Sequence, residues 1–89
     1  MTAADWQPTA TRERLALRAT LLRTARGFLT QRGALEVETP LAVNAAVTDV
    51  HLASAEVRFA ADDAPRFLHT SPEYAMKRLL AAGSGDIWQ

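Results

Sequence analysis

The sequence contains no cysteine. Disulfide bonds, thiolate nucleophiles and zinc sites built on cysteine are therefore excluded, and nothing indicates an oxidising compartment. The chain also lacks any apolar run near the roughly 18 residues that a membrane span requires. Its first residues show neither the basic start nor the apolar run of a signal peptide, and no repeat or low-complexity segment is present. These absences predict a soluble protein of the cytoplasm.

Neither sign of charge is in excess, because ten basic and ten acidic residues give a formal net charge of zero. Proteins that bind nucleic acids or membranes through electrostatics carry an excess of basic residues. The balance of charge therefore argues against both kinds of partner.

What the chain does have is a globular composition, with 48% hydrophobic and 22% charged residues. Its 89 residues suffice for one small domain or for part of a larger one. A lone domain of this size buries only about 60–65% of the surface that its unfolded chain exposes. Its stability is marginal without disulfides, a structural metal or oligomerisation. The chain ends on Ile87-Trp88-Gln89 without a turn or a polar tail, so we expect it to be truncated.

A long amphipathic helix is predicted over residues 12–32. Leu15, Leu22 and Leu29 recur at intervals of seven and form one apolar stripe. Thr9 or Thr11 is suited to begin the helix, and Gly33 to end it in the left-handed conformation. Residues 1–10 are expected to be a flexible N-terminal segment, and residues 11–89 are expected to belong to one domain.

The remaining segments predict an α+β fold. Residues 34–39 alternate apolar and polar side chains, as a half-buried strand does, and Pro40 ends that pattern. Residues 41–49 show no period and are expected to be a loop. A turn composition at residues 61–65 separates two strand candidates, which predicts an antiparallel hairpin. The further elements expected are strands at 55–59 and 66–69, a helix at 72–82, and the beginning of a strand at 86–89.

Ser71-Pro72-Glu73 is the segment whose local chemistry points most clearly to a ligand. Ser71 is a good N-cap and Pro72 suits the first helical position, although Thr70 and Glu73 could form a capping box instead. A helix N-terminus offers unpaired N–H groups, and the Glu73 carboxylate could hold an ammonium group. A zwitterion such as an amino acid fits both features. From local features alone, however, an ordinary capped helix start is the favoured interpretation.

The other polar and glycine-rich segments are not assigned a catalytic or binding function. His51 and His69 show no spacing typical of metal ligands, so no metal site is predicted. The serines have no recognisable histidine and carboxylate around them, so no nucleophile is predicted. The Gly83-Ser84-Gly85 segment is interpreted as a turn. Lys77 and Arg78 are interpreted as the solvated face of their helix.

Residues 28–40, FLTQRGALEVETP, resemble motif 1 of the class II aminoacyl-tRNA synthetases, particularly the lysyl, aspartyl and asparaginyl subgroup. In that family the motif is a long helix followed by a strand that ends at a proline, and it builds the dimer interface. The resemblance implies the N-terminal part of a class II catalytic domain, with antiparallel strands and a short helix after motif 1. It also implies a homodimer, whose interface would include Phe28, Leu35, Val37 and Pro40.

Two further segments narrow the resemblance: residues 47–52, VTDVHL, and residues 70–85, TSPEYAMKRLLAAGSG. Both look like the lysyl-tRNA synthetase paralogues that modify elongation factor P. Ordinary lysyl enzymes usually have an Ala-Pro-Glu-Leu type of sequence where this chain has Ser71-Pro72-Glu73-Tyr74. They also carry an N-terminal anticodon-binding domain, for which this sequence leaves no room before the helix. The resemblance therefore argues against tRNA as the acceptor.

The paralogues use ATP to form an adenylate of lysine or β-lysine and transfer the aminoacyl group to a lysine of elongation factor P. In this chain Ser71, Pro72 and Glu73 fall on the family's amino-acid-binding segment. ATP and Mg²⁺ are implied for the parent protein. Motifs 2 and 3 are absent, so we expect the 89-residue chain to be inactive alone and assign it no catalytic residue. Two alternatives remain open: the core of a true lysyl-tRNA synthetase, and a non-catalytic dimerisation module.

Overall fold

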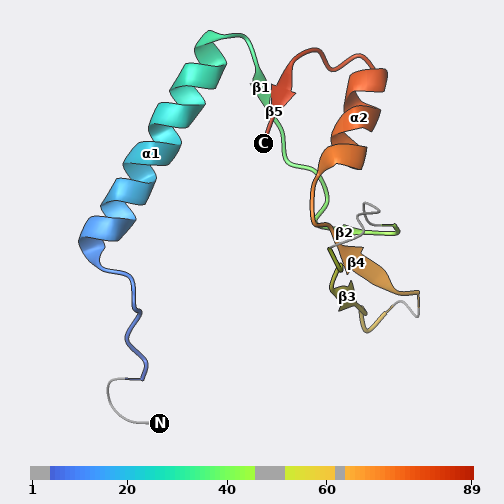
Figure 1. Ribbon diagram of the computed structural model, residues 1–89, viewed down its shortest axis with the longest axis horizontal. Helices are drawn as coiled ribbons and strands as arrows, with labels where there is room; N and C mark the ends of the chain where they lie inside the picture. The colour runs from blue at the N-terminus through green and yellow to red at the C-terminus, as the bar shows by residue number, and fades with distance from the viewer. Residues whose placement is uncertain (1–4, 46–51, 62–63) are drawn as a thin grey trace. The chain divides into compact units, whose positions relative to one another are not determined.

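The computed structural model describes residues 5–45, 52–61 and 64–89 (Figure 1). The chain divides into two compact units, Met1–Ala34 and Leu35–Gln89. The first unit contains helix α1 (Arg12–Gln31). The second contains β1 (Leu35–Glu36), β2 (Ala42–Val43), β3 (Glu56–Val57), β4 (Arg66–Leu68), helix α2 (Glu73–Ala81) and β5 (Ile87–Trp88). This mixture of two helices with short strands agrees with the predicted α+β class.

Helix α1 begins and ends at the signals expected from the sequence. Thr11 is its N-cap, and the Thr11 Oγ1 accepts a hydrogen bond from the Arg14 N–H at 3.2 Å. At the other end, the N–H groups of Gly33 and Ala34 donate to the carbonyls of Thr30 and Leu29. Gly33 adopts a φ of 81°, a left-handed conformation that glycine accepts without strain. The helix thus closes in a Schellman motif, one residue before the end that we predicted.

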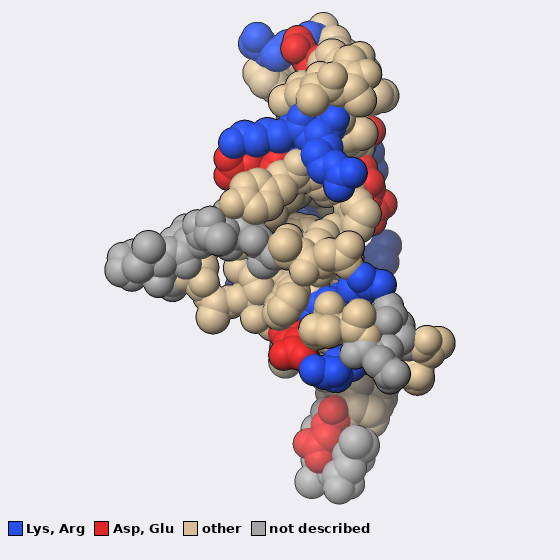
Figure 2. All heavy atoms as spheres, turned by 90° about the vertical axis from the view of Figure 1, so that its right-hand side faces the viewer, with Lys and Arg blue, Asp and Glu red and all other residues tan. Residues whose placement is uncertain are grey.

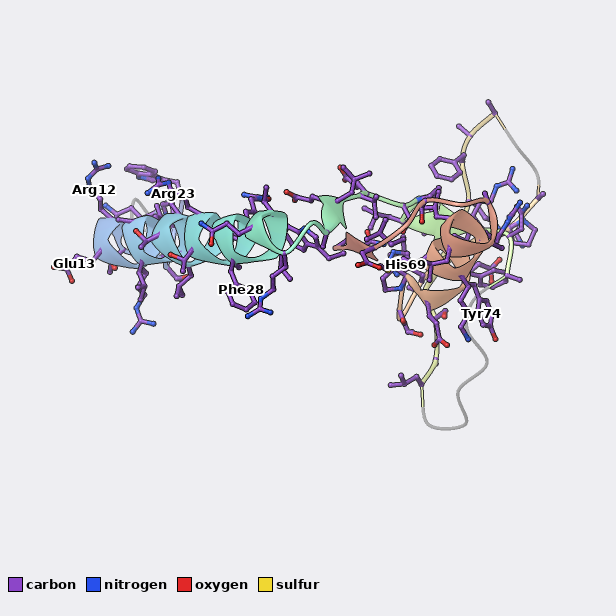
Figure 3. The ribbon with its side chains drawn as sticks, turned by 90° about the horizontal axis from the view of Figure 1, so that it is seen from above. Arg12, Glu13, Arg23, Phe28, His69 and Tyr74 are labelled. Carbon is purple, nitrogen blue, oxygen red and sulfur yellow. The ribbon has the colours of Figure 1, made fainter. Side chains whose placement is uncertain are left out.

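The apolar side chains of α1 are largely uncovered in the described part of the chain. No residue of this helix is buried, and Leu15 and Phe28 are 57% and 54% exposed. The Arg32 guanidinium lies over the Phe28 ring, 4.2 Å from its centroid. Arg12 and Arg23 project from one side of the helix and Phe28 from the opposite side (Figure 3).

A three-stranded antiparallel sheet has the order β2-β4-β3. Val57 pairs with Arg66 on one side of β4, and Ala42 pairs with Leu68 on the other. The predicted hairpin is confirmed by the β3–β4 pair, although both strands are shorter than expected. The prediction of a loop over residues 41–49 is wrong at Ala42–Val43, because these residues gain ladder hydrogen bonds from β4. Residues 46–51, which include His51 and most of the VTDVHL segment, lie outside the described residues.

A second, two-stranded sheet joins distant parts of the chain. β1 and β5 pair in parallel, with Leu35 opposite Ile87, and they appear side by side in Figure 1. The strand predicted over residues 34–39 is reduced to β1. Beyond it, the Thr39 N–H donates to the Gln89 Oε1 at 3.2 Å, and the Gln89 Nε2 donates to the Thr39 Oγ1 at 2.7 Å. The backbone N–H and the hydroxyl oxygen of Thr39 therefore both have a hydrogen-bond partner.

The described residues contain no fully buried hydrophobic side chain. Thr39, at 5% exposure, is the one buried residue among them. Large apolar side chains are exposed in both units, among them Leu35 at 61% and Leu41 at 64%. Apolar surface on this scale is typical of a surface that packs against more protein.

Candidate functional site

The candidate site lies where β4 has ended and α2 begins. Pro72 is the cap residue of α2 and Glu73 its first helical residue, so the prediction of Ser71 as N-cap and Pro72 as first helical residue is wrong by one position. The Ser71 hydroxyl still accepts a hydrogen bond from the Glu73 N–H, at 3.2 Å. Because that N–H is bound to Ser71, the alternative capping box with Thr70 does not form. Ser71 and Pro72 are half-buried, and Glu73 is exposed to solvent.

The Glu73 carboxylate forms an ion pair with the ammonium group of Lys77, which belongs to the same helix. The Glu73 Oε1 and the Lys77 Nζ lie 2.7 Å apart, one helical turn from each other, and their side chains are 49% and 66% exposed. The hydrogen bond that the Lys77 ammonium donates to Glu73, and then the negative charge of Glu73, raise the pKa of Lys77 above the ordinary value of 10.5. The carboxylate is therefore placed and charged to bind an alkylammonium ion.

We expect the substitution Glu73→Gln to lower the pKa of Lys77, because the two largest effects that raise this pKa come from the Glu73 carboxylate. Lys77 is the only lysine of the chain, so an NMR titration of its side chain has one signal to follow. A raised pKa stabilises the folded state below about pH 10.5, and this contribution is lost as the pH rises through the folded-state pKa. Glu56→Gln, which removes a carboxylate paired with Arg58, should leave the titration unchanged.

Two polar side chains in the second unit are shielded without a hydrogen-bond partner. Both ring nitrogens of His69 and the indole Nε1 of Trp88 have almost no solvent-accessible surface, and the described structure gives them no partner. His69, which is labelled in Figure 3, directly follows β4 in the chain. Shielded polar atoms are normally hydrogen-bonded. These three atoms are therefore exceptions to that rule among the described residues.

The interpretation of Arg78 as part of a solvated face was incomplete. Its side chain is exposed, yet it also lines a cavity between α2 and the β2–β4 part of the sheet, together with Arg66 and Tyr74. Arg66 and Arg78 come from a strand and a helix. No local sequence signal joins them, and they line one cavity only in the folded chain.

Three further observations concern metal ions, membranes and the distribution of basic residues on the surface. Among residues 5–45, 52–61 and 64–89, no three or more His, Asp or Glu gather as a metal site would require. In the same part of the chain, no helix is both long and apolar enough to cross a membrane. On the face shown in Figure 2, Lys and Arg form several separate groups rather than one continuous patch.

The chain belongs to the class II tRNA synthetase family that comprises the D, K and N enzymes, whose sequence pattern matches residues 2–89. The resemblance seen in the motif 1 segment is thus confirmed at the level of the family. The structure also shows the element order of that motif, a long helix, a glycine and a strand, followed by Pro40.

Within this family the chain is similar to proteins named elongation factor P–(R)-β-lysine ligase. The identity is 52% over 91 residues with the protein of Hamiltonella defensa and 53% over 89 residues with that of Actinobacillus succinogenes. It is 52% over 90 residues with that of Yersinia pestis. These matches cover 96–98% of this chain but 28% of each relative. The chain therefore spans little more than a quarter of the length of these ligases.

Proposed function

We propose that this chain is the N-terminal portion of an ATP-dependent class II ligase that activates lysine or β-lysine and transfers it to elongation factor P. The similarity to named ligases over nearly the whole chain supports the reaction class and the acceptor protein. The observation that carries the role of this segment is the Glu73 carboxylate, which already holds an alkylammonium group at 2.7 Å.

Ser71, Pro72 and Glu73 would form one wall of the amino-acid pocket. Lysine and β-lysine both carry two ammonium groups, and one of these would replace Lys77 on the Glu73 carboxylate. A charge-assisted hydrogen bond of this kind contributes about 1.5–3 kcal/mol where it is sheltered from water. The Ser71 hydroxyl has a positioning role, because its bond to the Glu73 N–H fixes the backbone from which the carboxylate projects.

ATP supplies an adenylyl group, which converts the amino acid's carboxylate into a mixed anhydride that an amine can attack. The family resemblance implies that most ATP contacts come from motifs 2 and 3, which these 89 residues do not include. We therefore assign both ATP and Mg²⁺ to the longer protein and derive no step through them here. The 89-residue chain alone would supply a wall of the amino-acid pocket and no catalysis.

We further propose that the parent protein is a cytoplasmic homodimer that uses Phe28, Leu35, Val37 and Pro40 at its interface. Phe28 belongs to the first compact unit, and the other three residues belong to the second. Phe28 and Leu35 are 54% and 61% exposed, Pro40 is exposed, and Val37 is half-buried. Surfaces of this kind lose unfavourable contact with water when a second copy covers them.

The test requires a protein that continues beyond Gln89 to the length of the relatives. Incubated with ATP and β-lysine or lysine, it is expected to release pyrophosphate and to add the aminoacyl group to elongation factor P, which mass spectrometry detects. Failure to activate either amino acid would refute the proposal. Charging of lysine tRNA without modification of elongation factor P would identify the alternative, a lysyl-tRNA synthetase core.

A further inference from the structure

A cavity of about 510 Å³ lies in the second unit, apart from the proposed amino-acid wall. Three elements or their flanks form it: the segment around β2, strand β4 and helix α2. Neither Ser71, Pro72 nor Glu73 is among its lining residues. The lining consists of Pro40, Ala42, Val43, Asn44, Ala45, Arg66, Tyr74, Ala75 and Arg78.

The described part of the lining contains two basic residues, Arg66 and Arg78. No Asp or Glu is among the described lining residues. The Arg66 Nη1 donates a hydrogen bond to the Asn44 Oδ1, which orients this guanidinium within the lining. The structure pairs Arg78 with no carboxylate in the described part of the chain. An anion bound in this cavity would be attracted by both positive charges.

The rest of the lining favours an organic anion over a bare inorganic one. Pro40, Ala42, Val43 and Ala75 offer apolar surface, and Tyr74 adds an aromatic ring. Cavities of roughly 300–1,000 Å³ that combine apolar walls with a few polar groups are typical of small-molecule sites. Arginine binds phosphate oxygens through paired N–H donors, and a phosphate monoester carries about −1.5 to −2 charges at neutral pH, which matches two guanidinium groups.

We propose that this cavity binds a small phosphate monoester with a flat apolar body. Arg66 and Arg78 would hold the phosphate, and the apolar walls with Tyr74 would cover the body. The site is separate from the proposed amino-acid wall, so the binding of such a ligand does not depend on the ligase reaction.

Phenyl phosphate is the probe that tests this site, because it joins a phosphate monoester to one aromatic ring. Titrated calorimetrically into the 89-residue chain, it is expected to bind at least about tenfold more tightly than inorganic phosphate, which lacks the ring. Benzyl alcohol, which lacks the charge, should not bind measurably. Arg78→Gln is expected to weaken phenyl phosphate binding about tenfold. The matched control is Arg12→Gln, which removes the same charge from α1, outside the cavity.

Circular dichroism of both variants checks that the helices remain. Equal affinity in the Arg78→Gln variant and the unchanged chain would overturn the proposal, as would equal weakening in the Arg12→Gln control. Inorganic phosphate binding as tightly as phenyl phosphate would show a simple anion site and contradict the role of the apolar walls. If Arg78→Gln alters the fold, Arg78→Lys keeps the charge but not the paired donors, and its binding should be intermediate.

Discussion

Replacing Glu73 with glutamine is expected to lower kcat/KM for amino-acid activation about ten- to a hundredfold in the proposed full-length ligase. The substitution keeps the shape of the side chain but removes the charge that would bind the substrate's ammonium group. The lost interaction, about 1.5–3 kcal/mol, corresponds to one to two factors of ten in the rate constant. Release of pyrophosphate that depends on lysine or β-lysine measures this effect directly.

The chain offers a matched control in Glu56. Its carboxylate is also 49% exposed and also pairs with one cation, Arg58, at 3.0 Å. Glu56→Gln therefore removes an equivalent charge from β3, outside the proposed amino-acid wall, and should leave activation unchanged. Equal losses in the two variants would indicate a general effect of charge, and full activity of Glu73→Gln would remove Glu73 from the pocket.

Replacing Phe28 with aspartate is expected to weaken the proposed homodimer by two or more factors of ten in Kd. Burial of one such ring is worth about 1.5–3 kcal/mol, and a two-fold interface contains the residue twice. The new carboxylates would also lose hydration at the interface. Sedimentation of the full-length protein over a range of concentrations measures the change.

Leu15→Asp is the control for this substitution. Leu15 has nearly the same exposure as Phe28, 57% against 54%, and lies on the same helix. The two residues are thirteen positions apart, which places them about 140° from each other around the helix axis. Dissociation caused by Leu15→Asp and not by Phe28→Asp would move the interface to the other side of α1. A parent protein that is monomeric at every concentration would refute the dimer.

The elements that the sequence predicts well are those whose determinants are local. Thr11 caps α1 through a hydrogen bond to a residue three positions on, and Gly33 ends the helix through bonds within the last turn. The hairpin follows from two strand patterns on either side of a turn composition. The ligand-binding role of Glu73 rests on the charge and position of one side chain at a helix start, and it stays a prediction.

The features that sequence reasoning missed depend on distant partners. Ala42 and Val43 are too few to show a period, and they become a strand because β4 supplies the ladder. The parallel pairing of β1 with β5 has no signature in either segment alone. Arg78 shows helical spacing that fits a solvated face, and its place at the cavity depends on how α2 lies relative to the segment around β2 and to strand β4. Each of these requires the tertiary arrangement.

The contact between Thr39 and Gln89 has a consequence for the order of folding. The two residues are 50 positions apart, and their hydrogen bonds lie beside the β1–β5 pair. Closing a loop of this length loses more chain entropy than forming α1 or the β3–β4 hairpin, which need only neighbouring residues. The helices and the hairpin should therefore appear first, and the small parallel sheet should form last and open first.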